Sequence, residues 1–462
     1  MNADVSVIGL GKLGASMLAG LASRGLHVIG VDVSEQAVEA VNQGRAPVEE
    51  TDLDATIRAH AGMVRATFDY EDAVHNSAVS FVIVPTPSDE RGAFSLKYAA
   101  ESFASIGRAL RSKNGYHVVV LTSTVLPGAT RHGLLPILEK ESGKKCGPDF
   151  GLCYNPEFIA LGSVIRNFLN PDFYLLGEFD ARSGEALAAV HTIVSANKAP
   201  IRRMSLENAE IAKIAVNSFV TLKISYANML AGLCEQIPGG DVDVVSEAIG
   251  TDSRIGRKYL TGGLGFGGPC FPRDNVALAF MGRQFGLDMS LLEANDAYNR
   301  RHGAGLLERL EGRIPAVGRA AVLGLAYKPF SHVIEESAAI LLCRALLAKG
   351  YEVAGYDPLA GRAAARELGE GLRVAGSIEE CLRGADIVFV TTPDPEFIAL
   401  EAGQFSQAGK KVYVVDFWRV LAKLAGVTGL AYIAGGRWLG RERSDLFKNL
   451  WNISNSGRGD RV

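Results

Sequence analysis

The chain of 462 residues lacks the features of several specialised protein classes. Its six cysteines are scattered, with no C-x-x-C pair and no metal-ligand spacing, so neither a disulfide framework nor a metal site is indicated. No apolar run reaches the roughly 18 residues that a membrane helix needs. The sequence enters a strand pattern almost at once, which leaves no room for a signal peptide. These absences predict a cytoplasmic protein without a membrane span.

Charge is scarce and balanced. Charged residues make up 21% of the chain and the net charge is -3, which argues against a nucleic-acid partner held by bulk charge. Hydrophobic residues make up 48% and there are 52 glycines, a composition that suits an α/β enzyme. Because one core cannot serve a chain of this length, we expect two or three domains.

A glycine turn follows the first predicted strand. Val5–Ile8 is a short apolar run, and the segment Gly9-Leu10-Gly11-Lys12-Leu13-Gly14 leads from it into a helical stretch. A second apolar strand then ends at Asp32. Glycines admit a pyrophosphate close to a helix N-terminus, and an aspartate placed there accepts the ribose hydroxyls, so the pattern predicts a dinucleotide site. The carboxylate would repel a 2′-phosphate, which favours NAD. Lys12 either touches phosphate or is solvated.

Two more apolar runs end in hydroxyl-rich loops. Val79–Val84 is followed by Pro85 and Thr86, and Val118–Leu121 is followed by a segment containing Thr124. Both runs read as buried parallel strands, whose carboxyl ends are where such sheets bind ligands. Pro85, Thr86 and Thr124 are therefore site candidates, although Thr86 could equally cap a turn.

A long helix is predicted from Ser205 to Gln236, where apolar residues recur at helical spacing. A helix of this length often forms a domain spine or a dimer interface. Lys213 and Asn217 share one of its faces, as residues four apart do. Before this helix, Glu157 follows a strand-like segment and is a candidate for a cleft position; a solvated glutamate is the alternative.

The second half of the chain repeats the pattern of the first. A predicted strand at 320–328 is followed by a helix that ends at Lys349 and by a second strand at 351–358. Asp357 ends this second strand, as Asp32 ends the second strand of the first half. This half has no G-x-G-x-x-G, so we expect it to bind a nucleotide other than a dinucleotide. The predicted fold is α/β, with two Rossmann-like doubly wound parallel sheets joined by a helical domain. The first predicted domain, 1–202, binds NAD. The second, 203–305, is helical and serves dimerisation and catalysis. The third, 306–462, is Rossmann-like and binds the other nucleotide.

The stretch from Gly265 to Asp274 combines glycines with a cysteine. The glycines let the backbone approach a ligand, and Pro272 suits the first turn of a helix. Cys270 would lie at that helix N-terminus, whose partial positive charge favours a thiolate. Asp274 lies one turn further on. A structural cysteine beside a tight turn is the alternative.

Taken together, these motifs resemble the UDP-glucose/GDP-mannose 6-dehydrogenase family over nearly the whole chain. The motifs that carry the resemblance occur in the family's order: Gly9 to Gly14, Val84-Pro85-Thr86-Pro87, Ser123-Thr124-Val125, Asn155-Pro156-Glu157-Phe158, Lys213 with Asn217, Gly267 to Asp274, Gly324 to Pro329 and Tyr356-Asp357-Pro358.

The resemblance implies an NAD-dependent, twofold oxidation of a sugar C6 alcohol to a carboxylate. By matched position Cys270 would be the nucleophile, Lys213 and Asn217 would stabilise the oxyanion, Asp274 and Glu157 would move protons, and Thr124 would hold a water. Arg254 would reach a neighbouring subunit, which implies a homodimer. The other residues that it assigns are Arg273 for the cofactor, and Phe158, Tyr259, Gly267, Phe271, Lys328, Trp418 and Arg419 for a nucleotide-sugar substrate.

The chain departs from the family pattern mainly at charged positions near the substrate. Leu161 replaces a glutamate, Thr261 replaces a lysine, and Glu335 stands where the family has an arginine. Trp418 stands where the family has a substrate-binding arginine, and the neighbouring Arg419 is the candidate to replace that arginine. Smaller departures are Arg273 for a lysine and Ala37 for a basic residue. We therefore expect an atypical nucleotide sugar or unusual anion contacts.

Two other functions compete with this interpretation. A two-electron dehydrogenase of the hydroxyacid type would share the first domain and a helix with Lys-x-x-x-Asn. A nucleotide-sugar-binding protein without turnover would bind the sugar and form no NADH.

Overall fold

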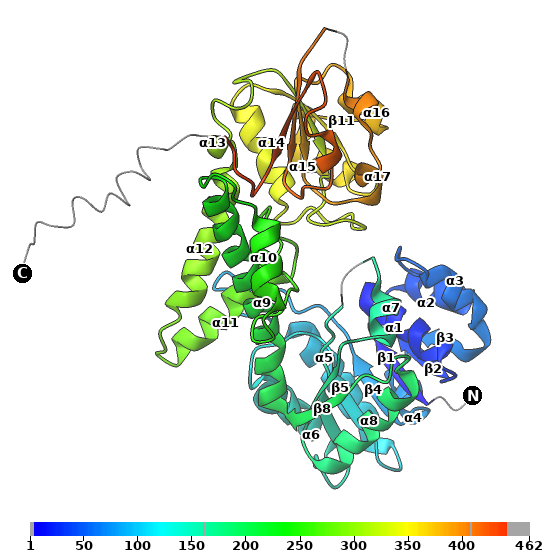
Figure 1. Cartoon of the computed structure of the whole chain (residues 1–462). Helices are drawn as coiled ribbons and strands as arrows, with labels where there is room; N and C mark the ends of the chain where they lie inside the picture. The colour runs from blue at the N-terminus through cyan, green and yellow to red at the C-terminus, as the bar shows by residue number, and fades with distance from the viewer. Residues whose placement is uncertain (1–3, 160–161, 407–408, 441–462) are drawn as a thin grey trace, which may run out of the picture. The chain divides into compact units, whose positions relative to one another are not determined.

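The computed structural model describes residues 4–159, 162–406 and 409–440 (Figure 1). The chain forms two compact units, one from Met1–Ser218 with Arg273–Met289, and the other from Phe219–Pro272 with Ser290–Val462. The first unit is therefore discontinuous in sequence. The predicted three-domain division is a different partition of the chain and stays a prediction.

The first unit is built on an eight-stranded sheet of order β3-β2-β1-β4-β5-β6-β7-β8. Neighbouring strands are parallel except β6 and β7, whose antiparallel pairing makes the sheet mixed. The strands are β1 Val5–Ile8, β2 Val28–Val31, β3 Val64–Thr67, β4 Val79–Val82, β5 Val118–Leu121, β6 Gly151–Tyr154, β7 Tyr174–Glu178 and β8 Ile201–Ser205.

Helices cover both faces of this sheet. Strand residues alternate between two buried clusters: Val118 and Val120 belong to one, and Val119 and Leu121 to the other. Burial on both faces explains the continuous apolar runs in the sequence. The helices are α1 Lys12–Ser23, α2 Glu35–Asn42, α3 Leu53–Ala59, α4 Tyr70–His75, α5 Lys97–Ser112, α6 Leu135–Ser142, α7 Val164–Leu169 and α8 Ala181–Val194, with a 3₁₀ turn Ala61–Met63 and a π-helical segment Ala129–Leu134.

The second sheet has six parallel strands in the order β11-β10-β9-β12-β13-β14. This is the Rossmann order, as the repeated sequence pattern predicts. The strands are β9 Arg319–Leu323, β10 Glu352–Tyr356, β11 Leu372–Val374, β12 Ile387–Val390, β13 Val412–Asp416 and β14 Leu430–Ala434; the helices around them are α14 Ala338–Ala348, α15 Gly361–Leu368, α16 Ile378–Leu382, α17 Pro395–Ile398 and α18 Ala402–Phe405, with 3₁₀ turns Gly369–Gly371 and Ala422–Leu424.

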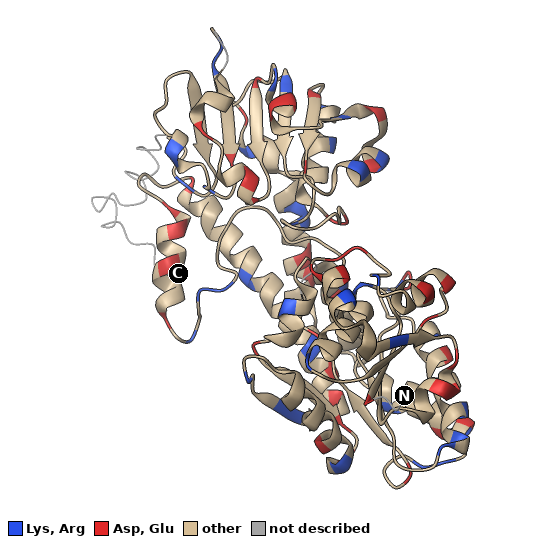
Figure 2. Cartoon of the chain, turned by 90° about the vertical axis from the view of Figure 1, so that its right-hand side faces the viewer, with Lys and Arg blue, Asp and Glu red and all other residues tan. Residues whose placement is uncertain are grey.

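The middle of the chain is helical, as predicted. The long helix α9 runs from Leu206 to Cys234, two residues short of the predicted span at its C-terminal end. The remaining helices are α10 Val242–Thr251, α11 Phe271–Gln284, α12 Ser290–Ala304 and α13 Leu306–Arg309. Charges of both signs are interspersed along the ribbon (Figure 2).

Candidate active site

The glycine turn between β1 and α1 has one closed side and one open side. Gly9 has φ 97°, and a Cβ there would overlap the carbonyl oxygen of Ile83. A Cβ on Gly14 would overlap the Gly9 carbonyl oxygen. Around Gly11, in contrast, a Cβ would meet no atom within 4 Å. The exposed Gly11 edge is where a phosphate can approach the N-terminus of α1.

Asp32 directly follows β2 and is held by backbone donors. Leu10 N donates to Asp32 Oδ2 at 2.6 Å, and Ser34 N donates to Oδ1 at 2.8 Å. The side chain remains partly exposed and each oxygen has further lone pairs. This geometry fits the ribose hydroxyls of NAD beside a pyrophosphate at Gly11. Lys12 and Leu13, also assigned to the cofactor, are partly exposed at the start of α1.

Loops after β4 and β5 are tied to each other and to α11. The Thr86 hydroxyl donates to Thr124 O at 2.7 Å. Arg273 Nη1 donates to Thr86 O at 3.2 Å, and its guanidinium lies 4.6 Å from the Phe94 ring centroid. Thr86 is thus a buried link between two strand ends, and the neighbouring Pro85 is exposed.

Asp274 and Asn217 form a buried pair. Asn217 Nδ2 donates to Asp274 Oδ2 at 2.6 Å, and Asp274 is 1% exposed. The other carboxylate oxygen, Oδ1, lies 3.6 Å from Nε of Arg273. A carboxylate and an amide that lie 57 residues apart in the sequence therefore meet in one unit.

Glu157 lies beside Lys213. Lys213 Nζ donates to the Glu157 backbone carbonyl at 2.8 Å and lies 4.6 Å from the Phe158 ring centroid. Burial raises the pKa of Glu157 to about 8, and the positive charge of Lys213 offsets part of that rise. Although part of the residue is exposed, Oε1 is buried and accepts no hydrogen bond within the described part of the chain. Glu157 is consequently suited to hold a proton at neutral pH.

Two supporting residues were not foreseen from the sequence. The fully buried Glu210 accepts from Gly128 N at 2.5 Å and Thr130 N at 2.9 Å, which fixes the turn after Thr124. His191 Nε2 bonds Asn155 Oδ1 at 2.8 Å, close to Glu157 in sequence. Burial lowers the pKa of His191 to about 3, so its ring is neutral. A glutamate within a helical stripe is the one signal that could have indicated Glu210.

In the second unit, the segment before Cys270 packs closely against residues 327–336. A Cβ on Gly267 would overlap the Glu336 carbonyl oxygen, and Gly268 N donates to Glu335 O at 3.0 Å. A Cβ on Gly268 would lie 2.5 Å from the Tyr327 ring. Burial, together with the negative charge of a Cys270 thiolate, raises the pKa of Tyr327 to about 12.

Cys270 directly precedes α11, as expected of a thiol at a helix N-terminus. Of the six cysteines it alone is exposed, and none is in a disulfide. Phe271, next in sequence, packs edge-on against Tyr259 with ring centroids 6.3 Å apart. Tyr259 is a residue with positive φ, 68°, and its side chain is half exposed. Such an unusual backbone conformation is most common at functional sites.

The remaining substrate candidates of the second unit lie partly or fully exposed, with one exception. Arg254 is paired with Asp252 at 2.6 Å and its side chain is 86% exposed. Lys328 lies 5.7 Å from the Tyr327 ring centroid. Trp418 is partly buried, and its Nε1 donates to Thr391 O at 2.8 Å. The fourth, Arg419, is buried.

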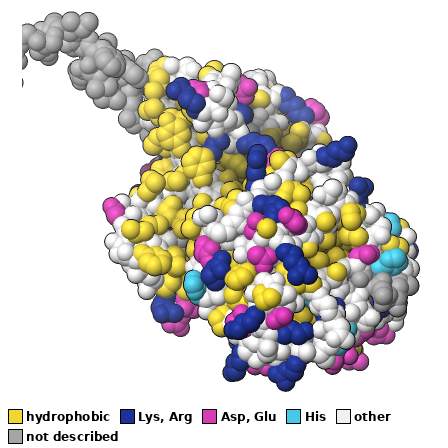
Figure 3. Space-filling model, turned by 90° about the horizontal axis from the view of Figure 1, so that it is seen from below, with side chains coloured by type: hydrophobic (Ala, Val, Ile, Leu, Met, Phe, Trp, Pro, Cys, Tyr) yellow, Lys and Arg dark blue, Asp and Glu magenta, His cyan; other side chains and the backbone are white. Residues whose placement is uncertain are grey.

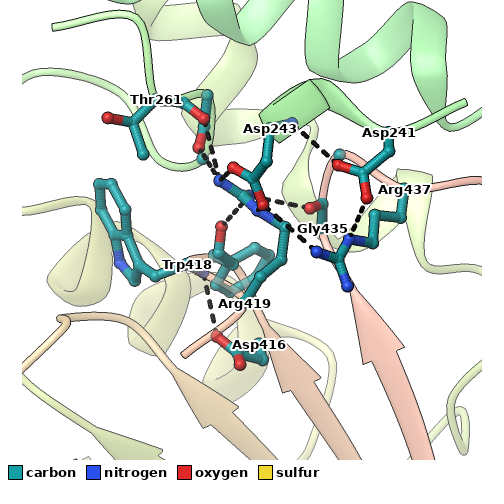
Figure 4. Close-up of polar contacts among 12 residues, drawn as sticks. Asp241, Asp243, Thr261, Asp416, Trp418, Arg419, Gly435 and Arg437 are labelled. Carbon is teal, nitrogen blue, oxygen red and sulfur yellow. Dashed lines mark hydrogen bonds and ion pairs between the residues drawn. The ribbon is translucent and has the colours of Figure 1, made fainter. Parts of the chain in front are cut away.

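Arg419 is bonded entirely within the protein (Figure 4). Its Nε and Nη2 donate to the Asp243 carboxylate, and Nη1 donates to the Phe417 and Gly435 carbonyls. Nη2 also donates to the Thr261 and Gly262 carbonyls. Since these bonds occupy all three nitrogens and the side chain is 1% exposed, Arg419 does not present a donor for substrate in this conformation.

The other departures from the family pattern differ in their exposure. Thr261 and Glu335 both expose their side chains. Ala37 is buried in α2, and its N–H donates a hydrogen bond to the side chain of the N-cap residue Ser34. Leu161 lies outside the described residues.

Three domain models of one protein family match successive parts of the chain. Residues 3–195 match the NAD binding domain of the UDP-glucose/GDP-mannose dehydrogenase family, residues 207–301 its central domain, and residues 321–423 its UDP binding domain. The chain belongs to this family. It is an NAD-dependent nucleotide-sugar dehydrogenase, and its cofactor is NAD, as the sequence predicts.

Individual relatives of the family agree over almost the full length. The chain is 37% identical to the UDP-glucose 6-dehydrogenase AglM of Haloferax volcanii, with 92% of this chain and 98% of that one aligned. It is 31% identical to the GDP-mannose 6-dehydrogenase of Pseudomonas putida, over 88% and 94%. The solved UDP-glucose dehydrogenase of Pyrobaculum islandicum has a TM-score of 0.82 at 33% identity, over 95% and 98%.

Within residues 4–159, 162–406 and 409–440, no group of three or more His, Cys, Asp or Glu side chains is placed to hold a metal ion. No helix in these ranges could span a membrane.

Proposed function

We propose that this dehydrogenase oxidises the C6 primary alcohol of a nucleotide sugar twice, to the carboxylate, with Cys270 as the covalent nucleophile. The observation that carries the proposal is the placement of Cys270: an exposed thiol, at the N-terminus of the 14-residue helix α11, after a glycine segment whose Gly267 tolerates no side chain. The five other cysteines are buried.

The reaction balances as two hydride transfers and one hydrolysis. The alcohol first loses a hydride and a proton to become an aldehyde. The Cys270 thiolate then adds to the aldehyde carbon, and the resulting thiohemiacetal loses a second hydride to give a thioester. Water cleaves the thioester, releasing the carboxylate and the thiol. NAD, when bound, accepts the hydride at each oxidation, so two NADH form per sugar.

The residues of the first unit would supply charge and proton transfer. The Lys213 ammonium, which donates to Glu157 O, and the Asn217 amide, which donates to Asp274, would also donate to the developing oxyanion. The raised pKa of Glu157 suits it to give and take a proton near neutral pH. Asp274 would accept a proton from the attacking water, which Thr124 would hold.

For the substrate, we propose a nucleotide sugar bound with fewer charged contacts than is usual in the family. Trp418, Thr261 and Glu335 replace three charged positions, and Arg419 is committed to Asp243. One charge-assisted contact contributes about 1.5 to 3 kcal/mol, so these replacements would reshape substrate preference. A panel of UDP-, GDP-, ADP- and TDP-sugars assayed by NADH formation identifies the base and sugar.

The covalent mechanism is tested with Cys270→Ser. This variant should stop carboxylate formation while retaining NAD binding, and Cys381→Ala, which alters a buried cysteine of α16, should keep both oxidations. Two NADH per substrate from Cys270→Ser would disprove the role of the thiol. One NADH per substrate in the wild type would support the two-electron alternative, and none with any sugar in the panel would support a binding protein without turnover.

We also propose a homodimer. Phe219, Tyr226, Met229 and Leu233 lie on α9 at spacings of seven, three and four residues, and each side chain is about half exposed. Such a stripe matches a helix-helix seam. Hydrophobic side chains also gather in patches on the surface shown in Figure 3. The highly exposed Arg254 is then available to a second copy's substrate.

The dimer is tested by light scattering. A mass of twice 49.2 kDa is expected for the wild type, and Tyr226→Glu with Met229→Glu should shift it towards the monomer. A monomeric wild type would contradict the proposal. Because the mechanism needs a reduced thiol and none of the cysteines is in a disulfide, the cytoplasm is the proposed compartment.

A further inference from the structure

Arg419 connects two segments of the second unit that are far apart in sequence. Its Nη2 donates to the carbonyl oxygens of Thr261 at 2.9 Å and Gly262 at 3.0 Å. These residues begin the segment 261–270, which we name the cysteine loop because it ends at Cys270. Arg419 itself follows β13 of the second sheet. One side chain thus joins the start of the cysteine loop to the carboxyl edge of that sheet.

A carboxylate holds the guanidinium in place for this task. Asp243, in the first turn of α10, accepts from Arg419 Nε at 2.8 Å and Nη2 at 2.9 Å, a two-point contact that fixes the plane of the group (Figure 4). Arg437 lies 3.4 Å from the same carboxylate and 2.8 Å from Asp241. Two arginines and two aspartates therefore balance their charges around α10.

The backbone around Arg419 is shaped for the same contact. Arg419 has φ 59°, a conformation that a residue with a side chain seldom adopts without compensation. The two preceding residues, Phe417 and Trp418, pack against Gly263. A Cβ added to Gly263 would lie 3.2 Å from the Trp418 ring and 3.1 Å from the Phe417 carbonyl oxygen. Three successive residues, 417–419, therefore contact three successive residues of the cysteine loop, 261–263.

The rest of the cysteine loop is held by hydrogen bonds to neutral side chains, namely Asn228, Asn299 and His302, and to backbone. Gly263 N donates to Asn228 Oδ1 at 2.7 Å, and Phe266 N donates to Asn299 Oδ1 at 2.9 Å. Further along, Gly268 N donates to Glu335 O at 3.0 Å. The loop is thus anchored from its first residue to two residues before Cys270, and the charged anchor lies at its start.

We infer that Arg419 is a positioning residue: it sets the cysteine loop, and through it the placement of Cys270 at the N-terminus of α11. The inference rests on the proposed covalent function, in which a misplaced nucleophile slows the second oxidation and leaves the first intact, because only the second uses the thiol. A displacement of about 1 Å in such a group lowers a rate by about a hundredfold.

The test compares Arg419→Lys with Arg437→Lys. Lysine at 419 retains a positive charge beside Asp243 but lacks the fork that reaches the carboxylate and both loop carbonyls at once. Arg437→Lys changes the same charge network without touching the loop. Asp243→Asn, which keeps an acceptor of the same shape, replaces Arg419→Lys if the latter does not fold by circular dichroism.

Three readouts separate positioning from general destabilisation. Arg419→Lys should slow oxidation of the aldehyde substrate at least tenfold while the first oxidation changes less than threefold, so trapped aldehyde accumulates. Alkylation of Cys270 by iodoacetamide, followed by mass spectrometry, should slow at least threefold. Arg437→Lys should change none of these. Equal loss in both oxidations, or unchanged alkylation in a folded variant, would overturn the inference.

A different result would disprove the proposed function itself. If Cys270→Ser still forms the carboxylate, the covalent mechanism is wrong, whereas the alkylation rates continue to report on the placement of Cys270 in the two arginine variants.

Discussion

The first six strands of the eight-stranded sheet follow the same order as the six strands of the second sheet, but the aspartates at the two carboxyl edges are bonded differently. In the first sheet, Asp32 accepts two backbone N–H groups and stays partly exposed. In the second, Asp357 accepts four, from Leu325, Ala326, Leu359 and Ala360. One aspartate retains acceptor capacity for a ligand, whereas its counterpart is satisfied by its own backbone.

The acids further along each sheet show the same contrast. Glu157, after β6, has a buried Oε1 that accepts nothing within the described residues. Asp416, at the end of β13, accepts from Trp418 N, Leu421 N and the Tyr432 hydroxyl. A repeated fold therefore does not imply a repeated site, because function depends on which polar groups the backbone leaves unsatisfied.

The largest effect that would break this comparison is expected at Gly9. Gly9→Ala would force a side chain into a positive φ and against the Ile83 carbonyl, which cannot yield, so stability should fall by at least about 2 kcal/mol and NAD binding should be lost. Thermal unfolding and calorimetry with NAD measure both effects.

Gly11→Ala is the matched control for Gly9. Because no protein atom lies within 4 Å of the added methyl group, the melting temperature should not fall, while NAD binding should weaken at least tenfold. Equal loss of stability in both variants would refute the division into a closed and an open side of the turn.

The next effect compares the two aspartates. Asp32→Asn should weaken NAD about 10- to 100-fold, corresponding to a charged hydrogen bond of about 1.5 to 3 kcal/mol, and should improve the relative use of NADP. Asp357→Asn should instead lower stability by about the same energy and leave the NAD dissociation constant unchanged. Calorimetry of both variants measures the NAD dissociation constant, and urea unfolding measures the free energy of unfolding. If Asp32→Asn lowers stability without weakening NAD binding, Asp32 does not bind the cofactor.

The last comparison concerns pH. Burial raises the pKa of Glu157 from its ordinary value of 4.5 to about 8 in the folded protein. Between pH 4.5 and pH 8 the folded state therefore binds more protons than the unfolded state. Stability contributed by the protonated group is therefore lost as the pH rises from about 4.5 to 8. The melting temperature of Glu157→Gln minus that of the wild type should therefore increase between about pH 4.5 and pH 8 and be constant above pH 8.

The control for this titration is Glu185→Gln on the exposed side of α8. It also removes one carboxylate, and its difference from the wild type should not grow across the same window. A pH-independent difference for Glu157→Gln would show that the carboxyl is ionised in the folded protein.

The sequence predicted the frame of the molecule well. Both sheets, the long helix and the glycine turn with Asp32 follow from apolar runs and glycine spacing, which are local signals. It could not predict the antiparallel pairing of β6 and β7, since a short apolar run carries no direction.

The site was predictable only as far as motifs reach. Cys270 and Asp274 belong to one stretch, but the fate of Arg419 depends on Asp243 and on carbonyls of residues 261 and 262, none of which its neighbours in sequence reveal. Likewise the pKa of Glu157 depends on burial, which no pattern around a lone glutamate encodes.

The discontinuity of the first unit has a consequence for how the protein is made. Ala277 and Leu278 of α11 complete a small core with Phe94, Leu126 and Ile214, yet they are translated only after residues 219–272 of the other unit. During synthesis the apolar surface of the first unit therefore stays incomplete until α11 has left the ribosome, and the Asn217–Asp274 bond cannot form before then. Assembly of the acid and amide is thus a late event in the life of the nascent chain.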